Sequence, residues 1–140
     1  MKYSNTHKIN RSWLVFANED ICDHYKSLHE AGFISWKRDD RRYKMLEGDI
    51  VYIFSSTERR IIFKTEIVCS ERRADSRYWR ITPPNDITWR LKSVQEYMGQ
   101  ALDESTMRLR GFNGGGSIQT PMCNNPDLFE YIENQFNIQS

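Results

Sequence analysis

The most constraining feature of this 140-residue chain is the stretch LEGDIVYIFSS, residues 46–56. A Gly-Asp pair that favours a turn precedes five consecutive apolar residues, 50–54. A short apolar run bounded by turn residues predicts a strand that passes through the core. The two serines that follow, Ser55 and Ser56, predict that this strand ends where the chain reaches a polar rim.

Further apolar segments predict a mixed domain around this strand. Residues 59–71 follow the first strand closely, which predicts an antiparallel hairpin. The order strand, helix, several strands, helix predicts an α+β fold, with a curved sheet or small β-barrel flanked by helices, in a single domain over 1–140. The predicted strands are 12–16, 33–36, 50–54, 59–71, 76–82 and 89–97, and the predicted helices are 21–31 and 124–136.

Positive charge is concentrated in the middle of the chain. Residues 37–80 contain twelve Lys or Arg and eight Asp or Glu, whereas the whole chain has 20 basic and 19 acidic residues. Such a surplus is typical of a face that binds a polyanion, and equally of an ordinary solvated surface. Under the first interpretation, phosphate contacts are expected from Arg59, Arg60, Arg72, Arg73 and Arg77.

Neither a membrane protein, a metal site nor an enzyme is indicated by the residues. The start MKYSNTHKIN does not resemble a signal peptide, and every apolar run is far shorter than a bilayer span, so we expect a cytoplasmic protein with no membrane partner. Three cysteines and three histidines lack the spacing of a disulfide framework or a metal site. Because no nucleophile with its base is recognisable, we expect no catalytic residue and no cofactor.

Aromatic residues make up 13% of the chain and include four tryptophans. Large flat side chains either pack in a core or stack on nucleic-acid bases. Trp13 lies within an apolar segment and is predicted to be a core residue. Trp36 lies between an extended apolar trio and the charged stretch KRDDRR, so we expect it at the border of a cleft. A ring in that position suits stacking on an unpaired or flipped base.

The Gly-rich segment GFNGGGS, residues 111–117, has two interpretations. It lacks the Gly-Lys-Ser/Thr ending of a phosphate-binding loop. A surface loop is the simpler interpretation. The alternative is a backbone that approaches a nucleic-acid strand at Gly114 and Gly115, because no side chain intervenes there.

Several of these stretches together resemble the EVE domain of the PUA-like superfamily, which is related to YTH domains. They are SWLVF followed by the tetrad ANED, then SWKRDDRR, GDIVYIF and IIFKTEIV. The later stretch LRGFNGGGSIQTPMCNNPDLFEYIENQF is similar to the end of EVE-like domains that are fused to McrB-type motors or HNH nucleases in modification-dependent restriction systems. The resemblance covers residues 12–136. The tetrad ANED lacks the proline that many EVE domains carry there.

The resemblance implies a small curved β-barrel flanked by helices that recognises a modified base, swung out of its helix into an aromatic cage. By position, Trp36 would be a cage wall, Asn18 would bind the base edge, and Ser55 or Ser56 would lie near the pocket. The implied partner is DNA carrying a modified base, with a nuclease or motor beside the reader. The candidate binding residues are therefore Asn18, Ser35, Trp36, Ser55, Ser56, Arg59, Arg60, Arg72, Arg73, Arg77, Trp79, Gly114 and Gly115.

Three other functions stay open at this point. The chain could bind modified RNA as a PUA-like domain, and dependence on the 2′-hydroxyl would then be expected. It could be a small hydrolase that uses the barrel pocket, although no acid, base and nucleophile set accompanies that idea. It could also be a purely structural interaction domain, as the Gly-rich loop and the acidic C-terminal helix would allow.

Overall fold

The computed structural model describes residues 11–113, 120–121 and 125–139. Within them, six strands form one sheet in the order β2-β5-β4-β3-β1-β6. The strands are β1 (Ser12–Ala17), β2 (Phe33–Lys37), β3 (Ile50–Ser55), β4 (Arg60–Arg72), β5 (Ile87–Glu96) and β6 (Thr120–Pro121). The helices are α1 (His24–Lys26), α2 (Glu104–Arg108) and α3 (Pro126–Gln139), with a π-helical turn over Ser27–Ala31 and a 3-10 turn over Ser76–Tyr78.

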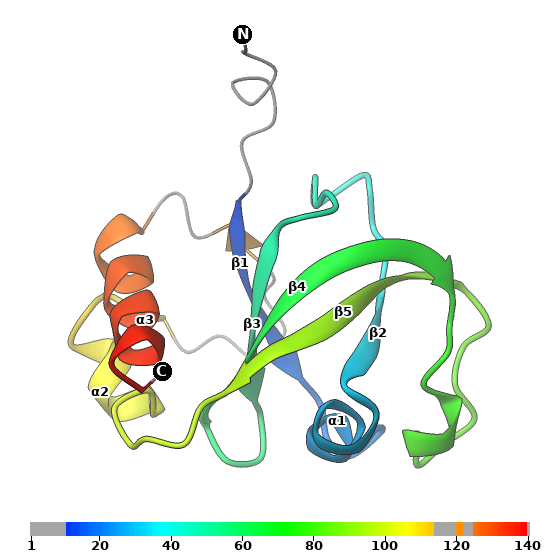
Figure 1. The fold of residues 1–140 in the computed structure, drawn as a ribbon, viewed down its shortest axis with the longest axis horizontal. Helices are drawn as coiled ribbons and strands as arrows, with labels where there is room; N and C mark the ends of the chain where they lie inside the picture. Colours follow the sequence, from blue (N-terminus) through cyan, green and yellow to red (C-terminus); the bar gives the residue numbers. More distant parts are fainter. Residues whose placement is uncertain (1–10, 114–119, 122–124, 140) are drawn as a thin grey trace, which may run out of the picture.

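The sheet is mixed and curved. β1 pairs with β3 in parallel, whereas β3 with β4, β4 with β5 and β2 with β5 are antiparallel. Register shifts interrupt the pairing of β4 with β5, and these two long strands are visibly bent in Figure 1. The predicted hairpin of β3 and β4 is confirmed, and so is the mixed α+β class with a curved sheet.

The apolar run of β3 is explained by burial on both faces of the sheet. Val51 and Ile53 point into one core with Trp13, whereas Tyr52 and Phe54 point into a second core beside α3. Side chains alternate along a strand, so a strand covered on both sides must be apolar at every position. The sequence predicted one core around this strand, and the structure has two.

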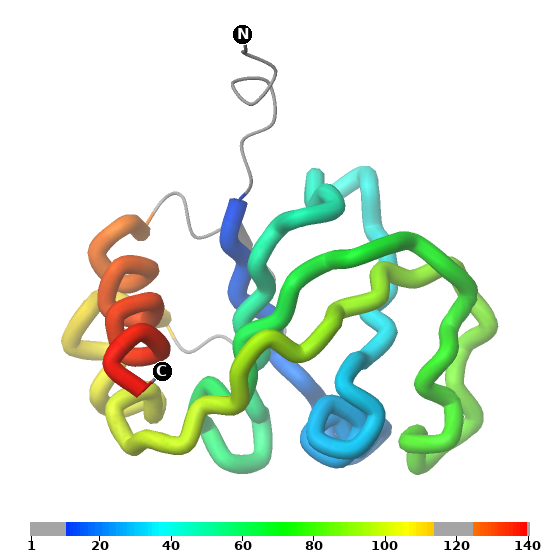
Figure 2. Tube along the Cα trace, in the orientation of Figure 1, coloured from blue at the N-terminus to red at the C-terminus, as the bar shows by residue number. Residues whose placement is uncertain are grey.

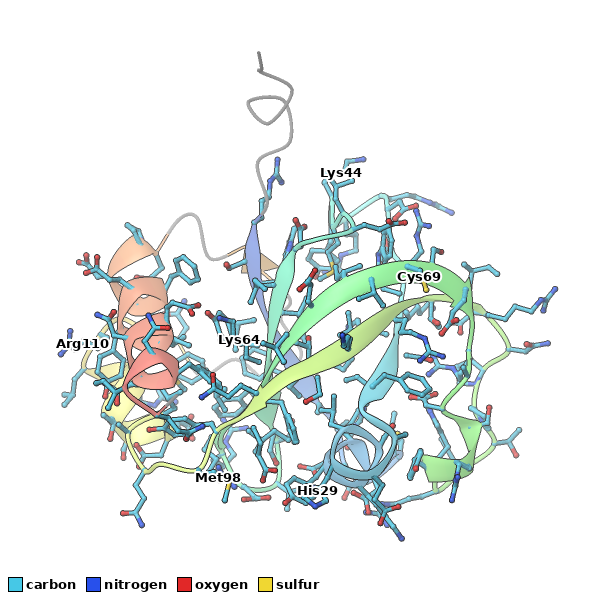
Figure 3. All side chains as sticks on the ribbon, in the orientation of Figure 1. His29, Lys44, Lys64, Cys69, Met98 and Arg110 are labelled. Carbon is cyan, nitrogen blue, oxygen red and sulfur yellow. The ribbon has the colours of Figure 1, made fainter. Side chains whose placement is uncertain are left out.

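Helices α2 and α3 cover the second core. Leu128, Ile132 and Phe136 are spaced by four residues along α3 and are all buried against the sheet. Lys64 extends from β4 toward α3, where its Nζ lies 2.6 Å from Glu133 Oε1 (Figure 3). Figure 2 shows both helices on the side of the molecule opposite the segment that follows β4. Helices α2 and α3 therefore do not cover the segment that follows β4.

One local prediction is wrong and one needs adjustment. Residues 76–82 were predicted to be a strand, but residues 76–78 form a 3-10 turn, and Trp79 joins Cys22 through an isolated bridge. The helix predicted over 21–31 begins at His24, because Asp23 caps it, and it continues as a π-helix over Ser27–Ala31 up to Gly32. Helix α2 was not predicted from the sequence. No helix within the described residues is long and apolar enough to cross a membrane.

The buried carboxylate of Asp49 anchors the start of β3. It is fully buried and accepts hydrogen bonds from Trp13 Nε1 at 2.9 Å, Arg11 N at 3.0 Å and Leu46 N at 2.9 Å. A buried carboxylate needs such donors to offset its loss of hydration. The turn before β3 is therefore fixed to β1 by one side chain.

We expect Asp49→Ala to lower the free energy of unfolding by about 3 kcal/mol, because one buried and two partly buried donors lose a charged acceptor. Chemical denaturation at neutral pH measures this loss. Glu47→Ala, an exposed carboxylate in the same turn, is the matched control and should cost less than about 0.5 kcal/mol. Equal losses in the two variants would contradict the anchoring role.

Candidate functional site

A cavity of about 190 Å³ lies where β1 ends, beside β2 and the segment that follows β4. Its volume is below the usual range of about 300–1,000 Å³ for sites that take drug-sized ligands, so it suits one ring system. Five of the residues predicted from the sequence lie here together, although they come from four separate segments. The lining residues are Phe16, Asn18, Ile21, His24, Ser35, Trp36, Lys37, Arg73 and Trp79.

The walls of this pocket are tied together by the carboxylate of Asp75, which is 1% exposed. Asp75 accepts hydrogen bonds from Ser35 N at 3.1 Å and from Trp79 Nε1 at 3.0 Å. Arg73 lies 3.3 Å from the same carboxylate and 3.2 Å from Asp86, and its side chain is 5% exposed. Because a buried ion pair must have its remaining donors and acceptors satisfied, this network fixes β2 and Trp79 relative to each other.

A second set of bonds fixes the turn after β1 against the segment after β4. Asn18 Oδ1 accepts from Asp20 N at 3.0 Å, which closes the turn locally. Asp23 N donates to Tyr78 O at 2.8 Å, and Arg80 N donates to Ile21 O at 2.8 Å. These backbone bonds hold two loops that are far apart in sequence as facing walls. With Asn18 Oδ1 engaged, the Asn18 amide nitrogen is the group available to a ligand.

Two tryptophans line the pocket in different ways. Trp36 is 9% exposed and belongs to the first core as well as to the pocket. The sequence predicted that Trp36 lies at the border of a cleft, and the structure shows that it is also a core residue. Trp79 is partly exposed, and the guanidinium of Arg73 lies 4.4 Å from its ring centroid. Trp13 is 1% exposed, which confirms its predicted place in the core.

His24 is the functional candidate that the sequence analysis missed. It begins α1, lines the pocket and is 6% exposed, with its ring centroid 5.8 Å from that of Trp36. Burial lowers the pKa of His24 from 6.5 to about 4, and the nearby Asp75 only partly offsets this effect. The imidazole is therefore neutral at pH 7. No spacing in the sequence indicates this role, because it depends on which residues fold around the ring.

The remaining serines, Ser55 and Ser56, and four of the five predicted arginines do not line this pocket. Ser55 is fully buried, and its hydroxyl donates to the carboxylate of Glu19, so it stabilises the turn after β1. Ser56 N donates to Ala17 O at 3.0 Å. Arg59 forms a two-pronged bond to Glu104, and Arg60 lies 2.8 Å from Glu58. These arginines are engaged with carboxylates at the turn between β3 and β4.

A shallow basic groove adjoins the pocket and shares Trp79 with it. The groove has a volume of about 240 Å³ and is lined by Asp23, Lys26, Arg77, Tyr78, Trp79 and Arg80. Arg77 is exposed, with its guanidinium 5.1 Å from the ring centroid of Tyr78. Arg72 is also exposed, at the end of β4. Gly114 and Gly115 lie outside the described residues.

Two larger hollows are less suited to a flat ligand. One, of about 720 Å³, borders Glu58, Glu96 and Asp103, and the other, of about 510 Å³, lies along α3. Neither is lined by a tryptophan. Among the described residues, no three His, Cys, Asp or Glu side chains are grouped so as to hold a metal ion.

Comparison with known proteins bears on the fold. No protein-family model and no curated protein match the sequence. A crystal structure of a protein from Pseudomonas putida has a TM-score of 0.60 at 15% identity over 89% of this chain and 98% of that one. The structure of a hypothetical protein from Leishmania major has a TM-score of 0.58 at 14% identity, over 94% of this chain and 97% of that one. A crystal structure of a protein from Agrobacterium tumefaciens has a TM-score of 0.57 at 13% identity, over 89% of this chain and 90% of that one. At these identities the likeness shows the fold alone.

The burial of His24 predicts a pH-dependent stability. Between pH 6.5 and about 4 the unfolded chain binds a proton at this ring that the folded chain does not, so the free energy of unfolding falls as the pH falls. By pH 4 this contribution should reach about 3 kcal/mol. In His24→Phe this pH-dependent contribution should disappear. The difference in free energy of unfolding between wild type and variant, measured by denaturation at pH 7, 5.5 and 4.5, should therefore change with pH. A constant difference would contradict the assignment.

Proposed function

We propose that this chain is a nucleic-acid-binding module that reads a modified base, taken out of a DNA helix and held in the pocket between β1, β2 and Trp79. The observation that carries the proposal is that both Trp36 and Trp79 line a pocket of one-ring size. Flat apolar side chains bind an extruded base by stacking, and polar groups around them read its edge. Asn18 and Ser35 supply such polar groups at the pocket wall.

The fold supports the same function. A mixed domain with a curved sheet is compatible with the EVE and PUA-like resemblance of the sequence, and we assign the chain to that class as part of this proposal. In that assignment the turn ANED keeps its place at the pocket through Asn18, although it lacks the proline found in many EVE domains. The internal hydrogen bond of Asn18 gives this turn a defined shape without proline.

Rigid walls favour selective binding of a base. The network around Asp75 holds Ser35 and Trp79 before any ligand arrives, so less conformational entropy is lost on binding. We assign Arg73 to this wall and not to phosphate binding, because its guanidinium is engaged with Asp75 and Asp86. Recognition of the base then depends on shape and on the polar edge, which a single modification changes.

The basic groove is the proposed path of the strand that carries the base. Lys26 and Arg77 line it together with Arg80, which also pairs with Asp23, and Lys37 lines the adjoining pocket. Phosphate contacts supply affinity and orientation without reading sequence. Among the arginines predicted for this role, we keep Arg77, which lines the groove, and Arg72, which is exposed at the end of β4. We set aside Arg59 and Arg60, which are bonded to Glu104 and Glu58.

A reader of this kind fits the specificity domain of a modification-dependent restriction or defence system in the cytoplasm, where a nuclease or motor would cut what the reader binds. The residues of the pocket supply binding and not catalysis. A duplex panel tests the proposal: one sequence with a single position carrying cytosine, its 5-methyl, 5-hydroxymethyl or glucosylated form, N6-methyladenine or an abasic site. Selective binding of one modified duplex is expected, and matched RNA duplexes test the RNA alternative through their 2′-hydroxyls.

Trp36→Leu should weaken binding of the preferred duplex by about 1–3 kcal/mol, because leucine cannot stack on a base. Trp36 also belongs to the first core, so its substitution lowers stability as well. Trp89→Leu is the matched control: Trp89 is 6% exposed and pairs with Trp36 across β2 and β5, but it does not line the pocket. Fluorescence anisotropy and thermal unfolding of both variants separate the two effects. Equal binding by the two variants would overturn the role of Trp36.

Arg77→Ala should reduce the slope of log K against log salt by about 1, because one phosphate contact releases about one counterion. Arg110→Ala is the control, because Arg110 lies beside α2 and α3 on the far side of the molecule (Figure 3). Titrations of one duplex from low to physiological salt give the two slopes. If the slope of Arg77→Ala equals that of wild type, the groove does not carry the strand.

A further inference from the structure

The imidazole of His24 has hydrogen-bonding capacity that the fold does not use. Its Nδ1 is buried and has no hydrogen-bond partner among the described residues. Buried side-chain nitrogens are hydrogen-bonded in most proteins, and each exception calls for an explanation. His24 lines the pocket that we assign to the base, so a bound ligand can reach the imidazole ring, whereas Nδ1 itself has almost no accessible surface before a ligand binds.

The charged groups around His24 do not supply that partner. Asp75, Asp23 and Arg73 are the charges that act on the ring, and the backbone carbonyl of Cys22 also faces it. Each charged group has other hydrogen-bond partners: Asp75 binds Trp79, Asp23 caps α1, and Arg73 binds Asp86. Because the pKa of the buried ring is lowered to about 4, the imidazole is neutral at pH 7. A neutral imidazole offers one N–H donor and one nitrogen acceptor.

The orientation of the imidazole limits how a stacked ligand can contact it. The planes of His24 and Trp36 are inclined by 47°. A flat ring stacked on Trp36 could not stack on the imidazole as well, which leaves its edge, where a base carries its carbonyl and amino groups, for contact with His24. Trp36 supplies the contact to the face, and His24 supplies the contact to the edge.

We propose that His24 is a specificity-determining residue that forms a hydrogen bond to the polar edge of the base in the pocket. This inference rests on the proposed function and goes beyond it, because it assigns edge recognition to a residue outside the family motifs. The ligand class is a planar heterocycle with an N–H or C=O group on the edge that faces α1. A site with a buried polar group discriminates strongly, since a ligand that cannot pair with it leaves that group unsatisfied.

His24→Phe tests the inference, because phenylalanine keeps the ring and removes both nitrogens. The probes are the duplex of the panel that wild type binds most tightly and the same duplex with an abasic site at that position. We expect His24→Phe to weaken binding of the first by about 5- to 100-fold and to leave binding of the abasic duplex unchanged. Partial recovery in His24→Asn or His24→Gln would show which nitrogen is used, since their amides lie near Nδ1 and Nε2 respectively.

Two results would overturn the inference: unchanged affinity of His24→Phe for the modified duplex, or an equal loss for both duplexes, which a purely structural role predicts. If His24→Phe does not fold, nitrogen NMR of the wild-type imidazole decides, because a new hydrogen bond shifts a ring nitrogen on addition of the modified duplex and not of the abasic one. Unshifted ring nitrogens would overturn it. Failure of the proposed function itself looks different, because wild type would then bind all members of the panel equally.

Discussion

Burial of β3 on both faces is the constraint on which the rest of the structure depends. Val51 and Ile53 require one apolar partner surface, and Tyr52 and Phe54 require another on the opposite face. The arching strands β4 and β5 enclose the first surface, and α2 with α3 covers the second (Figure 1). Because α2 and α3 lie against one face of the sheet, the pocket forms away from them, where β1 ends beside β2.

The pocket itself depends on polar chemistry and not on apolar packing. Asp75 joins β2 to Trp79 and Arg73 in a buried network, and each loop beside it is fixed by backbone hydrogen bonds. Such a network stabilises one arrangement of the walls only when all its members are satisfied. Two buried side-chain atoms have no hydrogen-bond partner in the described part of the chain: Oδ2 of Asp86, at the edge of this network, and Nδ1 of His24, beside it. His24 lines the pocket, which is why we assign its ring to the ligand.

The sequence predicted the elements that local pattern determines. The strands at 12–16 and 50–54 contain continuous apolar runs, the C-terminal helix has apolar residues at helical spacing, and Trp13 could be placed in the core from its apolar neighbours alone. Residues 76–82 were predicted to be a strand, whereas residues 76–78 form a 3-10 turn directly after Asp75, whose carboxylate accepts from the distant Ser35 N. Long-range hydrogen bonds of this kind leave no periodic trace in a sequence.

The candidate site was predicted in part for the same reason. Asn18, Trp36 and Trp79 could be proposed from residue type and resemblance, and they do lie together. Ser55 was expected near the pocket because it ends an apolar run, but it is buried beneath the turn, where it binds Glu19. His24 was not proposed for the site, since neither its neighbours in sequence nor its spacing from other histidines indicates that a pocket closes around it.

The central claim is that Trp36 and Trp79 hold an extruded base, and the four tryptophans of the chain allow one direct measurement of it. Each indole N–H gives its own signal in a nitrogen–proton NMR spectrum, and two of the four rings, Trp13 and Trp89, do not line the pocket. On titration with the preferred modified duplex, the signals of Trp36 and Trp79 should shift while those of Trp13 and Trp89 stay in place. Equal shifts with the unmodified duplex, or shifts confined to Trp13 and Trp89, would contradict the account.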